Sequence, residues 1–128
     1  MKAWSGLCLL LVVGCGHEVI DADKLNYRNG IAYKVNSEEP FTGKFVSYYD
    51  NGQKKSEGLV VKGKRVGKHV NYYENGQKSW ECIYKNGEED AASTSWYENG
   101  QKEYEMQYKD GEVEALKMWS RDGKQTLP

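Results

Sequence analysis

Proline, phenylalanine and cysteine are scarce in this sequence, and neither sign of charge is in excess. Only two Pro, two Phe and three Cys occur among 128 residues, against ten Tyr and 14 Gly. The 18 basic and 19 acidic side chains are interspersed and give a net charge of −1. A nucleic-acid-binding surface would show clustered Lys and Arg, so we expect no nucleic-acid partner. Abundant Tyr and Gly with a mean hydropathy of −0.85 favour a solvated β structure over a helical core.

Long apolar runs are also missing, with one exception at the amino terminus. From Leu7 to Val13 the chain is almost continuously apolar, which is too short for a transmembrane helix of about 20 residues. After the positive start Met1-Lys2, this run has the length of a secretory signal core. It ends in Val12-Val13-Gly14-Cys15, which resembles a bacterial lipobox, in which the cysteine is acylated.

The lipobox pattern predicts how the amino terminus is divided. We predict a lipoprotein signal peptide over residues 1–14, lipidation at Cys15 and a lipid-anchored polar tether over residues 15–28. An ordinary signal peptide cut near Gly16 is the alternative. Each buried methylene of an acyl chain contributes about 0.8 kcal/mol, so the anchor would hold the protein at the cell envelope. By resemblance to lipoprotein sorting in bacteria with two membranes, Gly16 in place of Asp favours the outer membrane.

The rest of the chain repeats one turn at a fixed period. Asn-Gly-Gln-Lys follows an acidic residue at Asp50, Glu74 and Glu98, which lie 24 residues apart, and a degraded copy begins 23 residues later at Arg121. A fixed period of this length indicates a repeat architecture. The sequence therefore predicts stacked copies of one supersecondary unit.

A second set of turn signals lies between these copies, at Lys62-Gly63, Asn86-Gly87 and Asp110-Gly111. Asn-Gly and Asp-Gly are strong hairpin signals because a type I′ turn needs positive φ at both central residues. We therefore predict an all-β fold over residues 29–128, a single antiparallel meander of β-hairpins in a twisted single-layer sheet. The expected two-residue turns are 51–52, 62–63, 75–76, 86–87, 99–100, 110–111 and 122–123.

Two-residue turns define which residues pair across neighbouring strands, and directly paired residues share a face. The pairs expected around Asn75-Gly76 are Tyr73 with Lys78, Asn71 with Trp80, and His69 with Cys82. The pairs expected around Asn86-Gly87 are Tyr84 with Glu89, Cys82 with Ala91, and Trp80 with Ser93. Both turns put Trp80, Cys82 and Tyr84 on one side, so the two registers agree.

These registers separate the side chains of the sheet into two faces. The first face is rich in aromatic residues and carries Phe45, Tyr49, Val60, His69, Tyr73, Trp80, Cys82, Tyr84, Tyr97, Tyr104, Met106 and Tyr108. The second face is mixed and carries Val46, Tyr48, Leu59, Val66, Val70, Tyr72, Ile83 and Trp96 with Lys44, Lys55, Glu57, Lys68, Glu81, Glu103 and Glu105. Aromatic side chains on the first face could mark a partner site or pack on one another in a curled sheet.

The strand between Gly111 and Asp122 does not fit this scheme. It has ten residues where its equivalents have eleven. Counting from one end of the strand places Trp119 on the first face, and counting from the opposite end places it on the second face. A one-residue slip exchanges the faces of a strand. We therefore predict a β-bulge or an altered turn within residues 112–121.

Two groups of residues could suggest chemistry. Glu57, Glu81 and Glu105 recur two strands apart, roughly 9.6 Å at ~4.8 Å per strand, which is too far for a shared metal. We expect a solvated ladder of charges instead, with Glu57 opposite Lys68.

Cys82 beside His69 is the one pair that could suggest a nucleophile and its base, which would make the protein a hydrolase. The pair lies in mid-strand without an orienting acid, and no disulfide is expected, because Cys8 leaves with the signal peptide and Cys15 carries lipid. We therefore predict that Cys82 is a small buried side chain. Catalytic, cofactor-binding and metal-binding residues are not expected.

The units beginning at Gly43 and Gly67, each with a Tyr-Tyr pair before the Asn-Gly-Gln-Lys turn, resemble MORN-repeat variants. Pro40-Phe41-Thr42-Gly43 resembles the start of such an array. The similarity covers roughly residues 40–123 and is greatest to the YwqK-type antitoxin group, often short bacterial lipoproteins. It implies a meander of β-hairpins and contact with other proteins, and it supplies no catalytic residues.

These observations predict a non-enzymatic, lipid-anchored scaffold that binds a protein partner at the cell envelope. Two alternatives are an antitoxin or immunity protein that neutralises a toxin, which rests on the family resemblance, and a structural protein that spaces envelope components. The candidate partner-binding residues are Tyr49, Tyr73, Trp80, Tyr84, Tyr97, Tyr104 and Tyr108.

Overall fold

A computed structural model describes residues 18–126 of the chain. The predicted signal peptide over residues 1–14 and the predicted lipidation site Cys15 lie outside the described residues. Nine strands form one sheet, and after the first they follow one another in chain order. They are β1 (Val19–Asp21), β4 (Gly43–Tyr48), β5 (Lys54–Val61), β6 (Lys64–Tyr72), β7 (Lys78–Lys85), β8 (Glu88–Trp96), β9 (Lys102–Lys109), β10 (Glu112–Trp119) and β11 (Gln125–Thr126).

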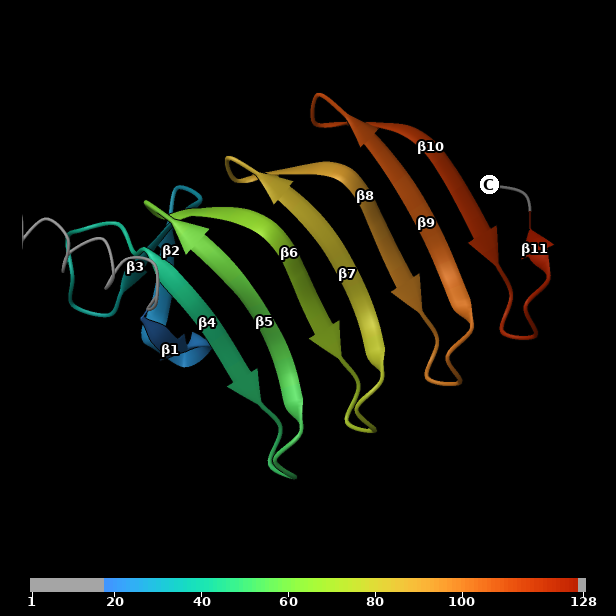
Figure 1. Ribbon diagram of the computed structural model, residues 1–128, viewed down its shortest axis with the longest axis horizontal. Coiled ribbons are helices and arrows are strands. Elements are labelled where there is room, and N and C mark those ends of the chain that lie inside the picture. Colours follow the sequence, from blue (N-terminus) through green and yellow to red (C-terminus); the bar gives the residue numbers. More distant parts are fainter. Residues whose placement is uncertain (1–17, 127–128) are drawn as a thin grey trace, which may run out of the picture.

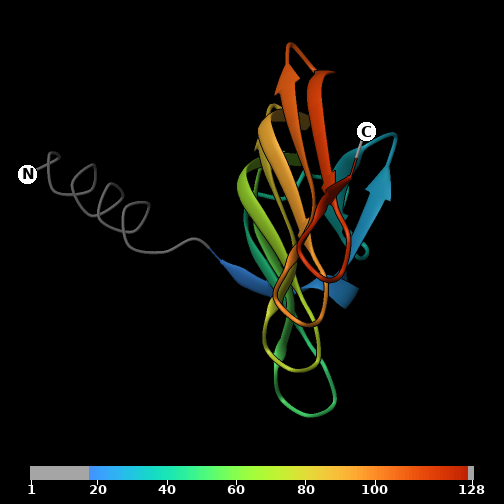
Figure 2. The same cartoon turned by 90° about the vertical axis from the view of Figure 1, so that its right-hand side faces the viewer.

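The predicted meander of β-hairpins is confirmed. Every neighbouring pair from β4 to β11 is antiparallel, and the arched hairpins stand side by side in a row (Figure 1). The exception to antiparallel pairing is β1, which runs parallel to β4 at the edge of the sheet. Viewed from the carboxyl-terminal end, the sheet is curved and twisted (Figure 2).

Two kinds of turn alternate along the array. Lys62-Gly63, Asn86-Gly87 and Asp110-Gly111 have positive φ at both residues, between 49° and 84°, as a two-residue type I′ turn requires. These predicted hairpin turns are confirmed, and they lie along one long edge of the row of hairpins, at the top of Figure 1.

The Asn-Gly-Gln turns along the opposite long edge have three-residue loops, so the prediction of two-residue turns there is wrong. In the second copy, Tyr73 N–H donates to Gln77 O at 2.8 Å, Gly76 N–H donates to Tyr73 O at 2.9 Å, and of the loop residues only Gly76 has positive φ. The Asn75 side chain accepts a hydrogen bond from Gln77 N–H at 3.0 Å, which stabilises this conformation. Lys78 consequently pairs with Tyr72 instead of Tyr73.

The expected pairs His69 with Cys82, Asn71 with Trp80, and Tyr84 with Glu89 are confirmed. The expected pairs Cys82 with Ala91 and Trp80 with Ser93 are wrong, because β8 contains a bulge that begins at Ala91, where φ is 61°. Beyond it, Cys82 pairs with Ser93 and Trp80 with Ser95. The shift is two residues, so the side chains keep the faces that were predicted from the register without a bulge.

The predicted irregularity in the last long strand is confirmed as a β-bulge between Val113 and Ala115 in β10. Here the shift is one residue, so the faces are exchanged beyond the bulge. Met118 pairs with Tyr104 of the first face, and Trp119 points to the second face, where the Lys102 ammonium lies 5.7 Å from its ring centroid.

An amino-terminal hairpin covers the first face at one end of the array. The 3₁₀ turn η1 (Ala22–Lys24) leads into β2 (Leu25–Arg28) and β3 (Ile31–Lys34), which form a separate two-stranded sheet to one side of the main sheet (Figure 2). Its side chains and the following loop enclose the main core of Ala32, Phe41, Phe45 and Val60. The predicted tether is therefore wrong for residues 19–28: they are folded, because β1 pairs with β4 and β2 pairs with β3.

Cross-strand pairs on the first face have complementary sizes. Phe45 pairs with Gly58, His69 with Cys82, and Ser93 with Met106. A Cβ atom at Gly58 would lie 2.5 Å from Nδ1 of His69, so the next unit's imidazole occupies the space that a side chain would take. In these three pairs a large residue faces a small one. The large residue lies on the first strand in the pairs of Phe45 and His69, and on the second strand in the pair of Met106.

Candidate functional site

The seven tyrosine and tryptophan residues proposed as a partner-binding face divide into three groups in the structure. Tyr49, Tyr73 and Tyr97 lie at the three-residue loops and bind the next unit. Their hydroxyls donate to the main-chain oxygens of Tyr72, Trp96 and Trp119 at 2.7, 2.7 and 3.0 Å. The loop asparagines Asn51, Asn75 and Asn99 donate to the following loop in the same way. These tyrosines therefore tie neighbouring hairpins together.

Tyr84 forms a group by itself because it is buried, with 9% of its surface exposed. Its ring centroid lies 4.9 Å from that of His69 and 6.5 Å from that of Trp80. Arg65 Nη1 donates to its hydroxyl at 3.2 Å. Tyr84 is therefore part of the packing of the first face and does not present a free surface.

Trp80, Tyr104 and Tyr108 form the third group and are only half-buried. They come from β7 and β9, beyond the part of the first face that β2 and β3 cover. Val113 and Met118 of β10 lie on the same face and are 53% and 38% exposed. On the first face, the half-buried Trp80, Tyr104 and Tyr108 thus lie in the carboxyl-terminal half of the array.

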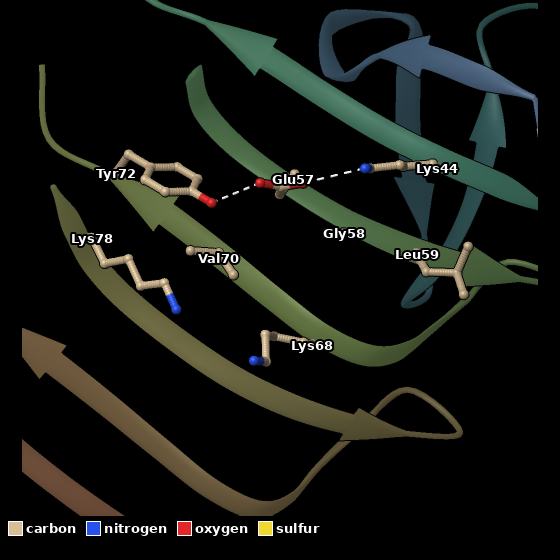
Figure 3. Close-up of a pocket in the computed structure, with 8 residues that line it drawn as sticks. All are labelled: Lys44, Glu57, Gly58, Leu59, Lys68, Val70, Tyr72 and Lys78. Carbon is tan, nitrogen blue, oxygen red and sulfur yellow. Dashed lines mark hydrogen bonds and ion pairs between the residues drawn. The ribbon is translucent and has the colours of Figure 1, made fainter. Parts of the chain in front are cut away.

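The second face carries a repeated cluster of lysine, glutamate and aromatic side chains. Lys44 lies 3.3 Å from the Glu57 carboxylate, and the Tyr72 hydroxyl donates to it at 2.7 Å (Figure 3). Lys54 also lies 3.1 Å from this carboxylate. The Tyr72 hydrogen bond and the lysines hold the pKa of Glu57 below its usual range. Burial, aided by the carboxylate of Glu57, raises the pKa of Tyr72 to about 12.

This cluster borders a hollow of about 310 Å³ between Lys44 and Lys78 (Figure 3). The expected pair of Glu57 with Lys68 is wrong: the bulge in β6 places Val70 opposite Glu57, and Lys68 lies 3.7 Å from Glu81. The lysines Lys44, Lys68 and Lys78 each have a glutamate partner, so the charges of this ladder are compensated.

Cys82 and His69 do not have the properties of a nucleophile and its base. Cys82 is fully buried, as predicted, and burial raises the pKa of its thiol to about 11, so the thiol stays protonated. His69 is 4% exposed, its Nε2–H donates to Leu59 O at 2.9 Å, and burial lowers its pKa. The thiol is protonated and the imidazole already donates a hydrogen bond to a carbonyl, so the two side chains form an unreactive pair.

Within residues 18–126, His, Cys, Asp and Glu side chains do not gather in any group that could hold a metal ion. The same part of the chain contains no helix with the length and apolarity needed to cross a membrane.

The repeated hairpins match a known family. A family model described as MORN repeat variant matches residues 41–62, 65–87 and 89–110, just over half of the chain. The chain belongs to the MORN repeat variant family. Each matched stretch is one MORN hairpin, β4–β5, β6–β7 or β8–β9, whereas β10–β11, which carries the one-residue bulge, lies outside the match. A search of curated proteins finds no match.

Two features next to the MORN hairpins escaped the sequence analysis. The first is the hairpin of β2 and β3, although Asn29-Gly30 between them is an Asn-Gly hairpin signal with φ of 53° and 78°. The second is Arg65, which stacks on Tyr27 of that hairpin and so depends on it. Because residues 19–28 have no MORN period, their fold could be recognised only from that single turn.

Proposed function

We propose that the protein is a non-enzymatic MORN-repeat scaffold that binds a protein partner with the first face of β7–β10. One observation carries the proposal: β2 and β3 cover the first face at the amino-terminal end, and the same face continues uncovered with Trp80, Tyr104 and Tyr108 half-buried. Membership of a repeat family without a catalytic residue set is consistent with a scaffold.

Tyrosine and tryptophan are the aromatic side chains left accessible on this part of the first face. Tyr and Trp combine a large apolar body with a polar tip, and they are enriched among the residues that contribute most to binding at protein interfaces. Val113 and Met118 extend the apolar area onto β10. Contiguous apolar surface of this kind marks interaction sites on soluble domains.

The test compares two pairs of half-buried aromatic residues on opposite faces. Trp80→Ala with Tyr104→Ala removes the proposed anchors, and Trp96→Ala with Trp119→Ala removes comparable side chains from the second face. Partners are captured from envelope extracts with each variant and quantified, after thermal unfolding has shown that both variants are folded. We expect only the first pair to lose a stoichiometric partner; equal capture by both variants would overturn the proposal.

We further propose that this scaffold is held at the cell envelope, at the outer membrane where there is one, by lipid on Cys15. The proposal rests on the lipobox-like Val12-Val13-Gly14-Cys15 after an apolar run. Wild type should incorporate labelled palmitate and fractionate with membranes, and Cys15→Ser should do neither. Unlabelled wild-type protein in the soluble fraction would contradict the anchor.

A second candidate, neutralisation of a toxin, rests on the likeness of the repeat units to the YwqK-type group. It makes the partner on the first face a toxin. Co-expression with a toxin encoded beside the gene should then restore growth in wild type and fail in the Trp80→Ala, Tyr104→Ala variant. No rescue by the wild-type protein would remove this candidate and leave the scaffold proposal intact.

A further inference from the structure

A hollow of about 450 Å³ lies on the first face, where the cover of the amino-terminal hairpin ends. This volume is within the range of roughly 300–1,000 Å³ that ligand sites occupy. The hollow is open to solvent on one side. Its lining residues are Phe45, Ser56, Glu57, Arg65, His69, Asn71 and Trp80.

Arg65 is the one positively charged residue of this lining, and its charge is uncompensated. Its guanidinium carbon lies 5.2 Å from the ring centroid of Tyr27 and 5.4 Å from that of Tyr84, so the group contacts two aromatic rings. Nη1 donates to the Tyr84 hydroxyl at 3.2 Å. Among the described residues no carboxylate oxygen lies within 4.0 Å of it.

The other polar groups around the hollow do not neutralise the positive charge of Arg65. Glu57 borders it, but its carboxylate is bound to Tyr72 and two lysines on the second face. His69 has its Nε2–H on Leu59 O, and the positive charge of Arg65 adds to burial in lowering the pKa of its imidazole. Asn71, which is exposed at the rim, and Ser56 are neutral.

The combination defines the ligand chemistry. Trp80 and Phe45 supply apolar walls, and a preoriented guanidinium with free N–H donors matches a carboxylate in a two-point hydrogen-bonding geometry. An uncharged ligand would accept only weaker hydrogen bonds from these donors, without the contribution of an opposite charge, and a cation would be repelled.

We propose that this hollow binds a carboxylate next to an apolar group, presented by an acidic segment of the protein partner. The inference rests on the proposed function for the source of the carboxylate. The carboxylate would anchor the partner at the boundary between the covered and the open part of the first face.

The first experiment uses phenylacetate as the probe and its neutral analogue phenylacetamide as the control. Titration of ¹⁵N-labelled protein is followed at the Trp80 indole N–H and the Arg65 Nε–H signals. We expect saturable shifts of both signals with phenylacetate and a response at least about tenfold weaker with phenylacetamide, because only the carboxylate gains a charge-assisted bond. Equal responses, or shifts confined to other residues, would overturn the inference.

Three variants locate the effect, and none of them changes a residue of the main core. Asn71→Asp places a negative charge at the exposed rim and should weaken phenylacetate binding by about tenfold, whereas Lys44→Gln on the second face should leave it unchanged. Arg65→Lys keeps the charge but loses the planar donor pair, and should also bind more weakly. Unchanged binding in Asn71→Asp would contradict the site.

The outcomes separate this inference from the proposed function. If phenylacetate fails to bind while the Trp80→Ala, Tyr104→Ala variant still loses its partner, the first face is a docking surface but this hollow is not its anchor. If phenylacetate binds as expected while partner capture is unaffected by that variant, the hollow stands as a carboxylate site and the proposed docking face is wrong.

Discussion

The two ends of the array use the same hairpins but bury very different amounts of apolar surface. At the amino-terminal end Phe41 is 3% exposed and Val60 is fully buried, whereas at the other end Val113 and Met118 remain 53% and 38% exposed. Antiparallel hydrogen bonding joins β4 to β5 and β9 to β10 in the same way. The difference comes from residues outside the repeat, which fold over the first face only where β4 and β5 begin the sheet.

The repeats build the sheet, and the segment before them covers the residues of the first repeat that form most of the core. A single-layer sheet has few ways to bury a face, since each unit contacts only its neighbours. Covering one end provides a stable starting point, and the units that follow are added by ladder bonds and by tyrosines such as Tyr49 and Tyr73. The uncovered end stays available to a partner.

The largest expected effect comes from removing a core side chain. Phe41→Ala should lower the free energy of unfolding by about 3–5 kcal/mol, because it leaves a cavity under the amino-terminal hairpin. Met118→Ala, at the open end, is the matched control and should cost well under half as much. Chemical denaturation of both variants measures the difference; similar losses would show that the two ends are equally packed.

Gly58→Ala should be the next most costly change, at about 1–3 kcal/mol, because the new Cβ would meet the His69 ring at 2.5 Å. The double variant Gly58→Ala, His69→Ala removes the clash. Adding Gly58→Ala to the His69→Ala protein should therefore cost much less than adding it to wild type. Additive losses in this double-mutant cycle would contradict the size-complementary packing.

A matched pair of substitutions tests the bulges of β6 and β8. Gly67 and Ala91 occupy equivalent positions with φ of 67° and 61°, and a Cβ atom at Gly67 would meet nothing within 4 Å. Gly67→Ala should therefore lower the free energy of unfolding by about 1 kcal/mol through backbone strain alone, and Ala91→Gly should raise it by up to about 1 kcal/mol. Effects of the same sign in both variants would refute the proposed equivalence.

The smallest expected effect is a pH dependence that belongs to the amino-terminal half. The pKa of His69 is lower in the folded protein than in the unfolded chain, so the unfolded chain binds the extra proton more readily. Stability should therefore be complete above the unfolded pKa of about 6.5 and fall as the pH drops through it. Denaturation between pH 8 and pH 5 should show this slope, and His69→Gln should flatten it.

Much of the fold could be predicted because the repeat gives several independent signals for one register. The pairs His69 with Cys82 and Tyr84 with Glu89 followed from turn positions alone. The three-residue loops could not, because the Asn75 side chain selects them by a hydrogen bond that the Asn-Gly pattern does not reveal. The bulge at Ala91 was equally hidden, and its two-residue shift preserved the predicted faces.

The candidate site was predicted less completely than the fold. Trp80 and Tyr104 were placed on the correct face, but alternation cannot distinguish an accessible aromatic residue from Tyr84, whose burial depends on contacts with Arg65 and His69. The limits of the open surface are set by the amino-terminal hairpin, which has no repeat partner in the sequence. Long-range packing of a unique segment is what periodicity cannot supply.

Photo-crosslinking from single positions tests the docking claim most directly. A benzophenone amino acid replaces Tyr104 on the first face or Trp119 on the second, two half-buried positions at the open end of the sheet. Irradiation in intact cells should join one discrete partner to the protein through position 104 and leave position 119 unreacted. Crosslinking to the same partner from position 119, with none from position 104, would contradict the account.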